Sequence, residues 1–183
     1  MVATTAQGEA RRIELQDAVI RVLESGGLGA VTHRAVAAEA RVPLAAATYY
    51  FASIDDLLVS ALLRVTTQQV ALFAHLDCRS LADTAIVLHG WVYGSRASAI
   101  AQYELLFLAM RRDSLREAAD LWYRTLEATI APIVPSGRYA RVVALAIDGL
   151  ILRMLWRGEP ASVGEVTAAL RDILRSVHRS NSA

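Results

Sequence analysis

The sequence predicts an all-α protein of about nine helices, with an N-terminal three-helix helix-turn-helix head followed by a C-terminal helical body. Three observations support this fold class. Glycine (10) and proline (4) are scarce among the 183 residues, no run of alternating β-branched residues indicates a strand, and apolar residues recur at helical spacing. A chain of this length can bury a sizeable core.

The first helix is predicted over residues 9–25, after a flexible arm at residues 1–8 that lacks an apolar signal core. Leu15, Val19 and Val22 fall on one apolar stripe of this helix. The Gly26-Gly27 pair ends it, because glycine adopts the left-handed closing conformation without a Cβ penalty.

Two short helices and a tight turn are predicted within residues 32–58. Thr32 and Ser53 are each placed to cap a helix, because a side-chain oxygen there accepts an orphaned backbone N–H. Asp56 completes a capping box with Ser53. Pro43 breaks the apolar run, since proline is tolerated in the first turn of a helix and not in its interior. This punctuation is typical of a helix-turn-helix.

The body is predicted to be helical throughout. Its expected helices cover residues 53–76, a segment from Ser80 or Asp83 to 97, and residues 102–112, 114–131, 136–157 and 162–179. Its most apolar window, residues 142–156, is interrupted by Asp148 and Arg153 and is too short to span a bilayer. We therefore expect no membrane role.

The net charge is only +1, and all 19 basic residues are arginine. In the first 64 residues six arginines face seven acidic residues. Any DNA binding must therefore come from the local placement of charges and not from a polycationic domain. The lone Cys78 leaves no disulfide framework or cysteine-based zinc site, which suits a reducing cytoplasm, and no cofactor or metal is expected.

The helix-turn-helix is predicted to bind double-stranded DNA. The alanines of its second helix permit close approach to the groove floor, and hydroxyl groups beside them can donate to phosphates. The start of its first helix favours a phosphate, and the start of its second helix lies nearest the bases. Val36 and Phe51 are assigned to the core. The residues predicted to contact DNA are Thr32, His33, Arg34, Leu44, Ala45, Ala46, Ala47, Thr48, Tyr49 and Tyr50.

Aromatic residues and methionines of the body, with a few polar residues among them, are candidates to line an apolar ligand cavity. The predicted ligand-binding residues are Trp91, Tyr103, Glu104, Phe107, Met110, Trp122 and Asp148. At any single position the alternative is a packed core residue or a satisfied buried polar group.

Two other classes of function compete with a ligand-responsive DNA binder. An enzyme is disfavoured, because the histidines at positions 33, 75, 89 and 178 are scattered and no zinc-protease, phosphate-loop or nucleophile-elbow motif occurs. His89 with Asp148 is the single candidate catalytic pair. A ligand-independent architectural DNA binder would instead have a solid body with no cavity.

The head resembles the tetracycline-repressor (TetR) family of bacterial transcriptional regulators. The matching features are SGGLGAVT, then HRAVAAEARVP and LAAATYYF, then S-x-D-D-L-L, and the body matches more loosely through QYELLFLAMRRD and ALAIDGLILRML. The resemblance implies a DNA-binding domain at residues 9–55 and a ligand-binding and dimerisation domain at 56–180. It also implies a homodimer through the last two long helices, and a repressor of a palindromic operator that a small, largely apolar effector releases.

Two positions depart from the pattern of the family. Many members carry glycine before the turn valine, where this chain has Arg41. Many carry a phosphate-contacting lysine after the serine cap, where this chain has Ile54. The nearly neutral head is therefore expected to depend on dimeric placement of two heads, with base discrimination through apolar contacts and DNA shape.

Overall fold

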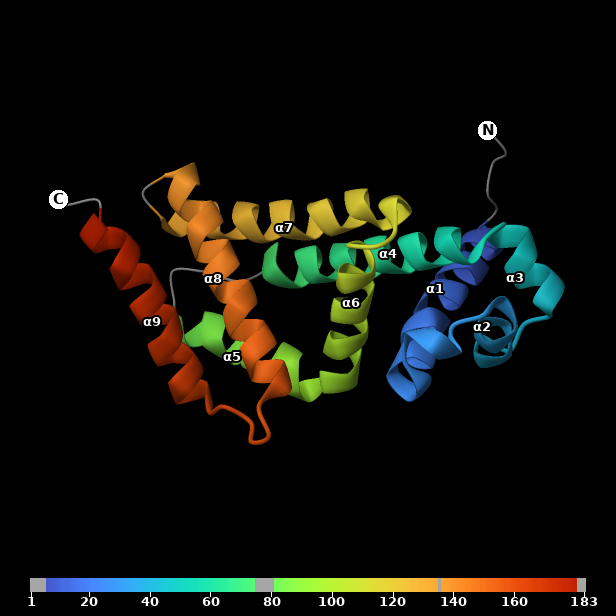
Figure 1. Ribbon diagram of the computed structural model, residues 1–183, viewed down its shortest axis with the longest axis horizontal. Coiled ribbons are helices and arrows are strands. Elements are labelled where there is room, and N and C mark those ends of the chain that lie inside the picture. Colours follow the sequence, from blue (N-terminus) through green and yellow to red (C-terminus); the bar gives the residue numbers. More distant parts are fainter. Residues whose placement is uncertain (1–5, 75–80, 135, 181–183) are drawn as a thin grey trace. The chain divides into compact units, whose positions relative to one another are not determined.

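A computed structural model describes residues 6–74, 81–134 and 136–180 of the chain (Figure 1). Within these ranges it contains nine α-helices, three short 3-10 helices and no strand. The prediction of an all-α fold of about nine helices is confirmed. Cys78 and the first five residues of the expected arm lie outside the described residues, and α1 already begins at Ala6.

The chain forms two compact units. Unit 1 comprises Met1–Thr67 and Ile100–Ala119, and unit 2 comprises Gln68–Ala99 and Asp120–Ala183. Unit 1 thus combines the helix-turn-helix with a later stretch of the chain, and the domain boundary expected at residue 55 stays a prediction.

Unit 1 is built mainly from the N-terminal helices. Its elements are α1 (Ala6–Gly26), η1 (Leu28–Ala30), α2 (His33–Glu39), α3 (Leu44–Tyr50), most of α4 (Ile54–Ala74), most of α6 (Arg96–Leu108), η2 (Asp113–Leu115) and the start of α7 (Arg116–Ile130). Its core includes the fully buried Leu15, Val36 and Leu57, together with Phe51. Burying an apolar side chain of this size contributes about 1.5–3 kcal/mol to the stability of the folded state. Val36 and Phe51 are therefore core residues, as predicted.

The helix ends of the head follow the predicted local signals. Thr32 Oγ1 accepts the backbone N–H of Ala35 at 3.1 Å. The Ser53 and Asp56 side chains each accept the backbone N–H of the other residue, at 3.0 and 3.1 Å, which is a complete capping box. Gly27 directly follows α1 with φ +66° and ψ −175°, a backbone conformation that favours glycine, so the predicted end of this helix at the glycine pair is confirmed.

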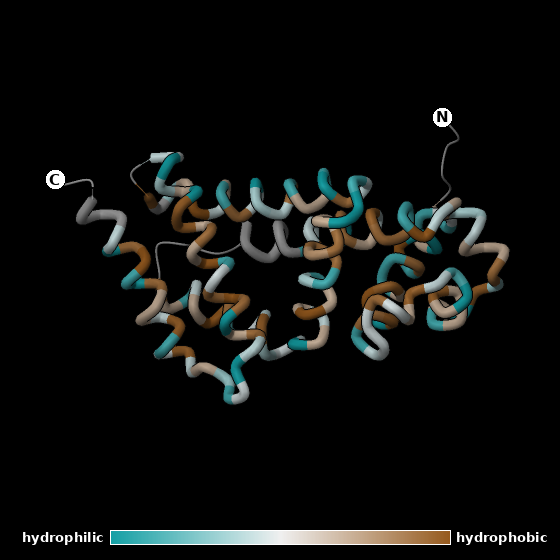
Figure 2. The backbone as a smooth tube through the Cα atoms, viewed as in Figure 1, coloured by the Kyte–Doolittle hydropathy of each residue, from teal (hydrophilic) through white to brown (hydrophobic). Residues whose placement is uncertain are grey.

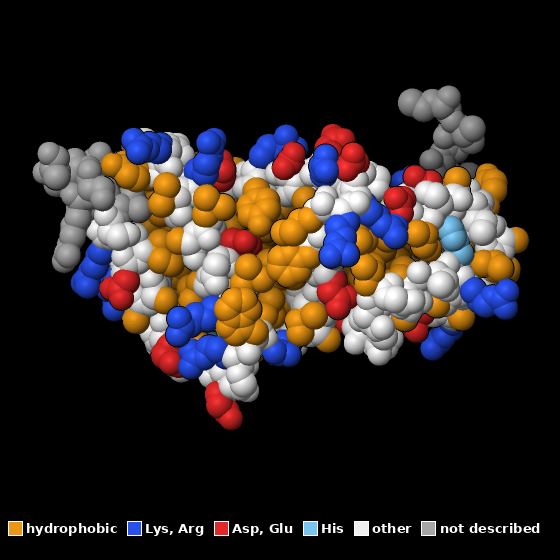
Figure 3. Space-filling view, in the orientation of Figure 1, with side chains coloured by type: hydrophobic (Ala, Val, Ile, Leu, Met, Phe, Trp, Pro, Cys, Tyr) orange, Lys and Arg blue, Asp and Glu red, His pale blue; other side chains and the backbone are white. Residues whose placement is uncertain are grey.

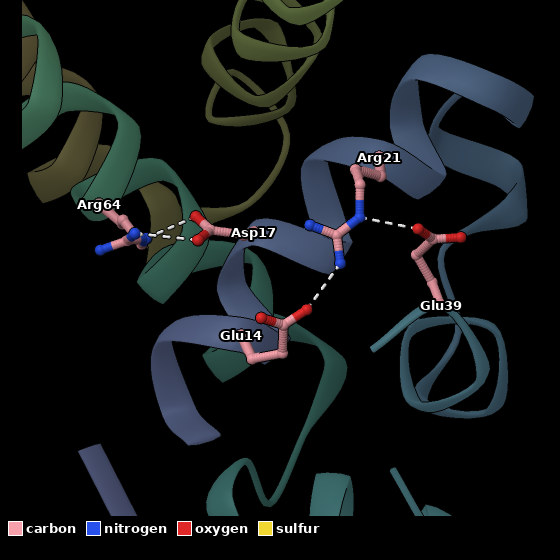
Figure 4. Close-up of polar contacts among 5 residues, drawn as sticks. All are labelled: Glu14, Asp17, Arg21, Glu39 and Arg64. Carbon is pink, nitrogen blue, oxygen red and sulfur yellow. Dashed lines mark hydrogen bonds and ion pairs between the residues drawn. The ribbon is translucent and has the colours of Figure 1, made fainter. Parts of the chain in front are cut away.

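Ion pairs join α1 to its neighbours in unit 1 (Figure 4). Arg64 of α4 donates to both oxygens of Asp17, at 2.6 and 2.9 Å. Arg21 donates to Glu39 of α2 at 2.7 Å and to Glu14 at 3.0 Å. Hydrogen bonding to these carboxylates raises the pKa of both guanidinium groups, Arg21 chiefly through Glu39 and Arg64 through Asp17.

Unit 2 contains α5 (Leu81–Gly94), the remainder of α7, η3 (Ala131–Ile133), α8 (Gly137–Trp156) and α9 (Val163–Ser180). Helix α5 packs on both α8 and α9. Tyr93 of α5 lies at the turn between them, because its hydroxyl donates to the Met154 carbonyl at 3.4 Å and accepts the Ala161 N–H at 2.9 Å. Arg96 donates to the next carbonyl, that of Leu155. These bonds satisfy carbonyls at the C-terminal end of α8.

The predicted helix limits differ from the structure where α5 meets α6. A helix was expected to run through residue 97 and another to cover residues 102–112, whereas α5 ends at Gly94 and α6 extends from Arg96 to Leu108. Residues 94–98, GSRAS, are small or polar throughout, so periodicity does not show at which of them the break falls.

Among the described residues no single helix is long and apolar enough to cross a membrane. One bent pair, Leu44–Tyr50 with Ile54–Gln68, passes by length and composition alone, with a 74° angle between its helices. Several leucines of that pair, including Leu57 and Leu62, are buried in unit 1.

Candidate DNA-binding surface and effector site

The turn between α2 and α3 is closed by two backbone hydrogen bonds. Arg41 N–H donates to the Ala38 carbonyl at 3.1 Å, and Val42 N–H donates to the Ala37 carbonyl at 2.9 Å. This pairing is a Schellman motif, whose closing residue adopts the left-handed conformation. Arg41 is that residue, with φ +54°. Val42 and Ala37, the two positions that are commonly apolar in this motif, are both buried.

The predicted DNA-binding residues differ in their access to a ligand. Thr32, Arg34, Leu44, Ala45, Thr48 and Tyr49 are exposed, whereas His33, Ala46 and Tyr50 are half-buried. Ala47 is fully buried. Its assignment to the DNA surface was therefore wrong, because its methyl group packs inside unit 1 and cannot reach a base.

The two tyrosines at the end of α3 have different environments. Tyr49 is 81% exposed, while Tyr50 is half-buried and meets the Tyr49 ring edge to face at 5.2 Å. Tyr49 can therefore extend its hydroxyl toward a phosphate, with Tyr50 supporting its ring.

His33 has a structural contact in addition to its position at the start of α2. Its Nε2 lies 3.0 Å from the carbonyl oxygen of Phe51, which follows α3. A proton on Nε2 would donate to that carbonyl, and the bond ties the start of α2 to the end of α3. This nitrogen is then occupied within the head, which leaves Nδ1 for any other contact.

The charges of the head are divided between ion pairs and the surface. Arg21 and Arg64 are used in ion pairs. Arg12 lies over the Phe51 ring, 5.4 Å from its centroid. Arg34 and Arg41 are exposed, and neither forms an ion pair with a described residue. Arg34 lies in the first turn of α2 and Arg41 in the turn between α2 and α3, so both lie within the helix-turn-helix and can meet an anion.

The predicted ligand-binding residues fall into two groups, one in each unit. In unit 2, Trp91 of α5 and Trp122 of α7 lie with ring centroids 5.9 Å apart and planes tilted by 35°. Trp122 is buried, and its Nε1 has no hydrogen-bond partner. The structure thus brings two of the predicted aromatic residues together and leaves one buried donor that a water molecule or a ligand group could satisfy.

Asp148 of α8 is a buried carboxylate in the same unit. The Tyr123 hydroxyl donates to its Oδ2 at 3.2 Å. Burial, together with the negative charge and the hydrogen bond of Asp148, raises the pKa of Tyr123 to about 12. A half-buried phenol held neutral beside a buried carboxylate gives this unit a polar pair among its apolar residues.

In unit 1, the second group lies on α6 and, for Met110, in the turn that follows it. Tyr103 is buried and lies 5.9 Å from the Phe107 ring, whereas Phe107 and Met110 are 48% and 75% exposed. Glu104 is half-buried, and its Oε2 is enclosed without a hydrogen-bond partner. Tyr103 and the Glu104 Oε2 atom are therefore enclosed, while Phe107 and Met110 lie on the surface.

Two buried polar residues of unit 1 were not predicted. Thr66 Oγ1 and Gln102 Nε2 are both buried and without a hydrogen-bond partner. Enclosed polar atoms of this kind need a water molecule or a ligand group. The sequence signal that could have predicted their burial was a polar residue on the apolar face of a helix.

Unit 1 also connects α6 to the head. Asp55, at the start of α4, accepts hydrogen bonds from Arg112 and, at 3.2 Å, from the Ser114 hydroxyl. Glu104 Oε1 lies 3.8 Å from the position that a Cβ atom on Gly27 would take. The segment after the predicted ligand-binding residues of α6 thus contacts the helix that follows α3.

The chain combines an exposed helix-turn-helix with a helical body that contains buried aromatic and acidic side chains. This combination is typical of helix-turn-helix regulators that carry a second, helical domain. The family description "Tetracyclin repressor-like, C-terminal domain" matches residues 78–179. The chain belongs to the TetR family of transcriptional regulators.

Solved structures agree with this assignment. The multidrug binding protein EbrR in complex with ethidium is similar to this chain with a TM-score of 0.78 and 33% identity, over 90% of this chain and 98% of EbrR. The TetR-family protein SCO1917 from Streptomyces coelicolor A3 has a TM-score of 0.77 and 34% identity, over 90% and 98% of the two chains. No match is found among curated proteins.

Proposed function

We propose that this protein is a ligand-responsive transcriptional repressor that binds a palindromic operator as a homodimer and is not an enzyme. The observation that carries the proposal is the exposed surface of α3, held between a capped α2 and the capping box that opens α4. Leu44, Ala45 and Thr48 on that surface are small or apolar, so α3 can lie close to base edges and to thymine methyl groups. Such a regulator acts on chromosomal DNA in the cytoplasm.

The dimer is formed by the last two long helices, in particular by α8. Val142, Leu145, Gly149 and Trp156 are all exposed on α8, and their spacing of 3, 4 and 7 places them on one face. Hydrophobic residues recur along α8 in Figure 2, and hydrophobic side chains gather over it in Figure 3. Trp156 is 75% exposed. An apolar stripe of this length fits a second copy of the same helix, and Gly149 allows close approach.

Dimerisation also fits the weak charge of the head. Two heads related by a two-fold axis can occupy successive half-sites of a palindrome, one helical turn apart. Each head supplies few unpaired arginines, so high affinity needs both heads at once. An effector that changes the spacing between the two heads then controls DNA binding, because both heads can no longer reach their half-sites at once.

The effector is small and mainly apolar. Support comes from the Trp91 and Trp122 pair and from the buried Asp148, which together offer flat apolar surface and one carboxylate. EbrR, at 33% identity, has been solved in complex with ethidium, with proflavin and with malachite green. These three compounds are aromatic cations, and a similar effector would suit this set of side chains.

Effector binding lowers DNA affinity by favouring a conformation that does not fit the operator. The contacts of Asp55 with Arg112 and Ser114 are a physical route, because they join the segment that follows α6 to the helix that follows α3. A displacement of α6 can therefore reach α3 within unit 1.

The proposal is tested by a mobility shift with the intergenic DNA upstream of the gene for this protein. We expect a salt-sensitive shift that resists unrelated competitor DNA, and we expect it to weaken when malachite green is added as a probe effector, while the shift of an unrelated DNA-binding protein under the same conditions stays unchanged. Arg34→Ala should weaken binding to all sequences and flatten the salt dependence. The absence of a competitor-resistant shift would contradict DNA regulation. A shift that no tested aromatic cation weakens would favour the architectural DNA binder.

A further inference from the structure

Arg41 occupies a backbone position that normally suits a residue without a side chain. Its φ of +54° is the left-handed conformation that closes the Schellman motif of α2. A Cβ atom disfavours this conformation, and glycine adopts it freely. Among the described residues Arg41 is the one non-glycine residue with a positive φ. A long charged side chain held at such a position calls for a role that offsets its backbone cost.

No interaction with a described residue supplies that role. The Arg41 side chain is exposed and has no hydrogen bond or ion pair with a described residue. By contrast, Arg21 and Arg64 are held by carboxylates on neighbouring helices. The backbone of Arg41 closes the turn, and glycine would close it equally well. The part of the residue left without a role in the fold is therefore the guanidinium group.

The position of Arg41 places that group beside the reading helix. Only Val42 and Pro43 separate it from α3, which begins at Leu44. Helix α3 itself, LAAATYY, carries no charge. Arginine side chains lie at the surface over the α2–α3 end of unit 1 in Figure 3. When α3 enters a major groove, a cation just before its first turn faces the edge of that groove, where the phosphates are.

We infer that Arg41 binds a phosphate of the operator backbone and supplies a charge contact that α3 lacks. This inference rests on the proposed DNA binding. The contact is electrostatic and independent of base sequence, so it strengthens binding to all duplexes and releases counterions on each of the two heads. The left-handed turn fixes the direction in which the side chain leaves the backbone, which reduces the freedom lost on binding.

The test compares wild type with Arg41→Gly, Arg41→Asn and Arg41→Lys on two duplexes. One duplex is selected by the wild-type protein from a random-sequence library, and the other is an unrelated sequence of the same length. Glycine and asparagine both tolerate the left-handed conformation but lack the charge, and lysine keeps the charge. Arg124→Ala, an exposed arginine of α7 in unit 2 without a described ion pair, is the matched control.

We expect Arg41→Gly and Arg41→Asn to weaken binding to both duplexes by roughly tenfold per head at 0.1 M salt, since each lost phosphate contact removes about one unit of the logarithmic salt slope. Arg41→Lys should retain most of the affinity and the slope. The melting temperature of Arg41→Gly should equal or exceed that of wild type, and Arg124→Ala should match wild type throughout.

The outcomes separate this inference from the proposed function. If wild type selects no duplex, DNA binding itself fails. If wild type binds and the glycine and asparagine variants bind with the same affinity and salt slope, only the Arg41 contact is overturned. A lysine variant as weak as the glycine variant, on the selected duplex alone, would make Arg41 a base-reading residue and contradict the phosphate assignment. A lower melting temperature for both uncharged variants would assign it a structural role.

Discussion

Arg64 of α4 holds Asp17 of α1 through both carboxylate oxygens, at 2.6 and 2.9 Å, with both side chains mostly shielded from solvent. This pair fixes the first helix of the head against the helix that follows the helix-turn-helix. Arg64→Ala should lower the free energy of unfolding by about 1 kcal/mol, because a bidentate, partly buried pair is stronger than a surface one. Urea denaturation followed by circular dichroism measures the change.

The matched control for this pair is Arg116→Ala. Arg116 pairs with Asp113 at 2.8 Å, but both side chains are largely exposed, so the substitution should leave stability within about 0.5 kcal/mol of wild type. If Arg64→Ala and Arg116→Ala lower the free energy of unfolding equally, the ion pair between α1 and α4 stabilises the head no more than an exposed pair does.

Ser53→Ala removes one half of the capping box at the start of α4. The Asp56 N–H then loses its acceptor at 3.0 Å, so stability should fall by about 1 kcal/mol and the melting temperature by about 2–4 °C. Thr67→Ala is the control, because the Thr67 hydroxyl donates only to the Leu63 carbonyl of its own helix. Thermal melts of the two variants side by side check the prediction, which fails if they are indistinguishable.

Tyr123 should ionise at a higher pH than an exposed tyrosine. Burial and Asp148 raise its pKa from 10.0 to about 12, which favours the neutral phenol in the folded state. Its contribution to stability is therefore complete below pH 10 and is lost as the pH rises toward 12. Ultraviolet absorbance of tyrosinate measures this, and the step near pH 12 should be missing in Tyr123→Phe. If the variant loses a step near pH 10 instead, the phenol does not sense Asp148.

Leu145→Glu should convert the protein to a monomer, because it places a charge in the middle of the exposed apolar stripe of α8. Light scattering at micromolar concentration measures the mass, and operator affinity should fall with dimerisation. Ile86→Glu is the matched control, since Ile86 is also exposed but lies on α5. If the Leu145→Glu protein stays dimeric, or if the wild type is monomeric, α8 does not form a dimer interface.

The parts of the fold that depend on neighbouring residues could be predicted from the sequence. The Thr32 cap, the Ser53 and Asp56 box and the Gly27 closure each rest on residues within four positions of one another, and each is present. The same holds for the break at Pro43, which separates the two helices of the helix-turn-helix.

Features set by tertiary packing could not be predicted in the same way. Ala47 faces the interior because α2 and α3 pack together, and its sequence neighbours Ala45 and Ala46 carry no sign of this difference. Phe107 and Met110 look like cavity residues by composition, yet both are exposed on their segment. The left-handed backbone of Arg41 was also hidden, because arginine is not a residue that indicates such a turn.

A nuclease footprint on the upstream intergenic DNA, with wild type and Ala46→Glu compared, tests the central claim most directly. Ala46 lies half-buried on α3, beside the exposed Ala45, so a carboxylate there would meet the DNA and repel its phosphates. We predict that wild type protects a palindromic segment with two half-sites about one helical turn apart. Ala46→Glu, with an unchanged circular dichroism spectrum, should protect nothing. No protection by wild type, or the same footprint with both proteins, would contradict DNA reading by α3.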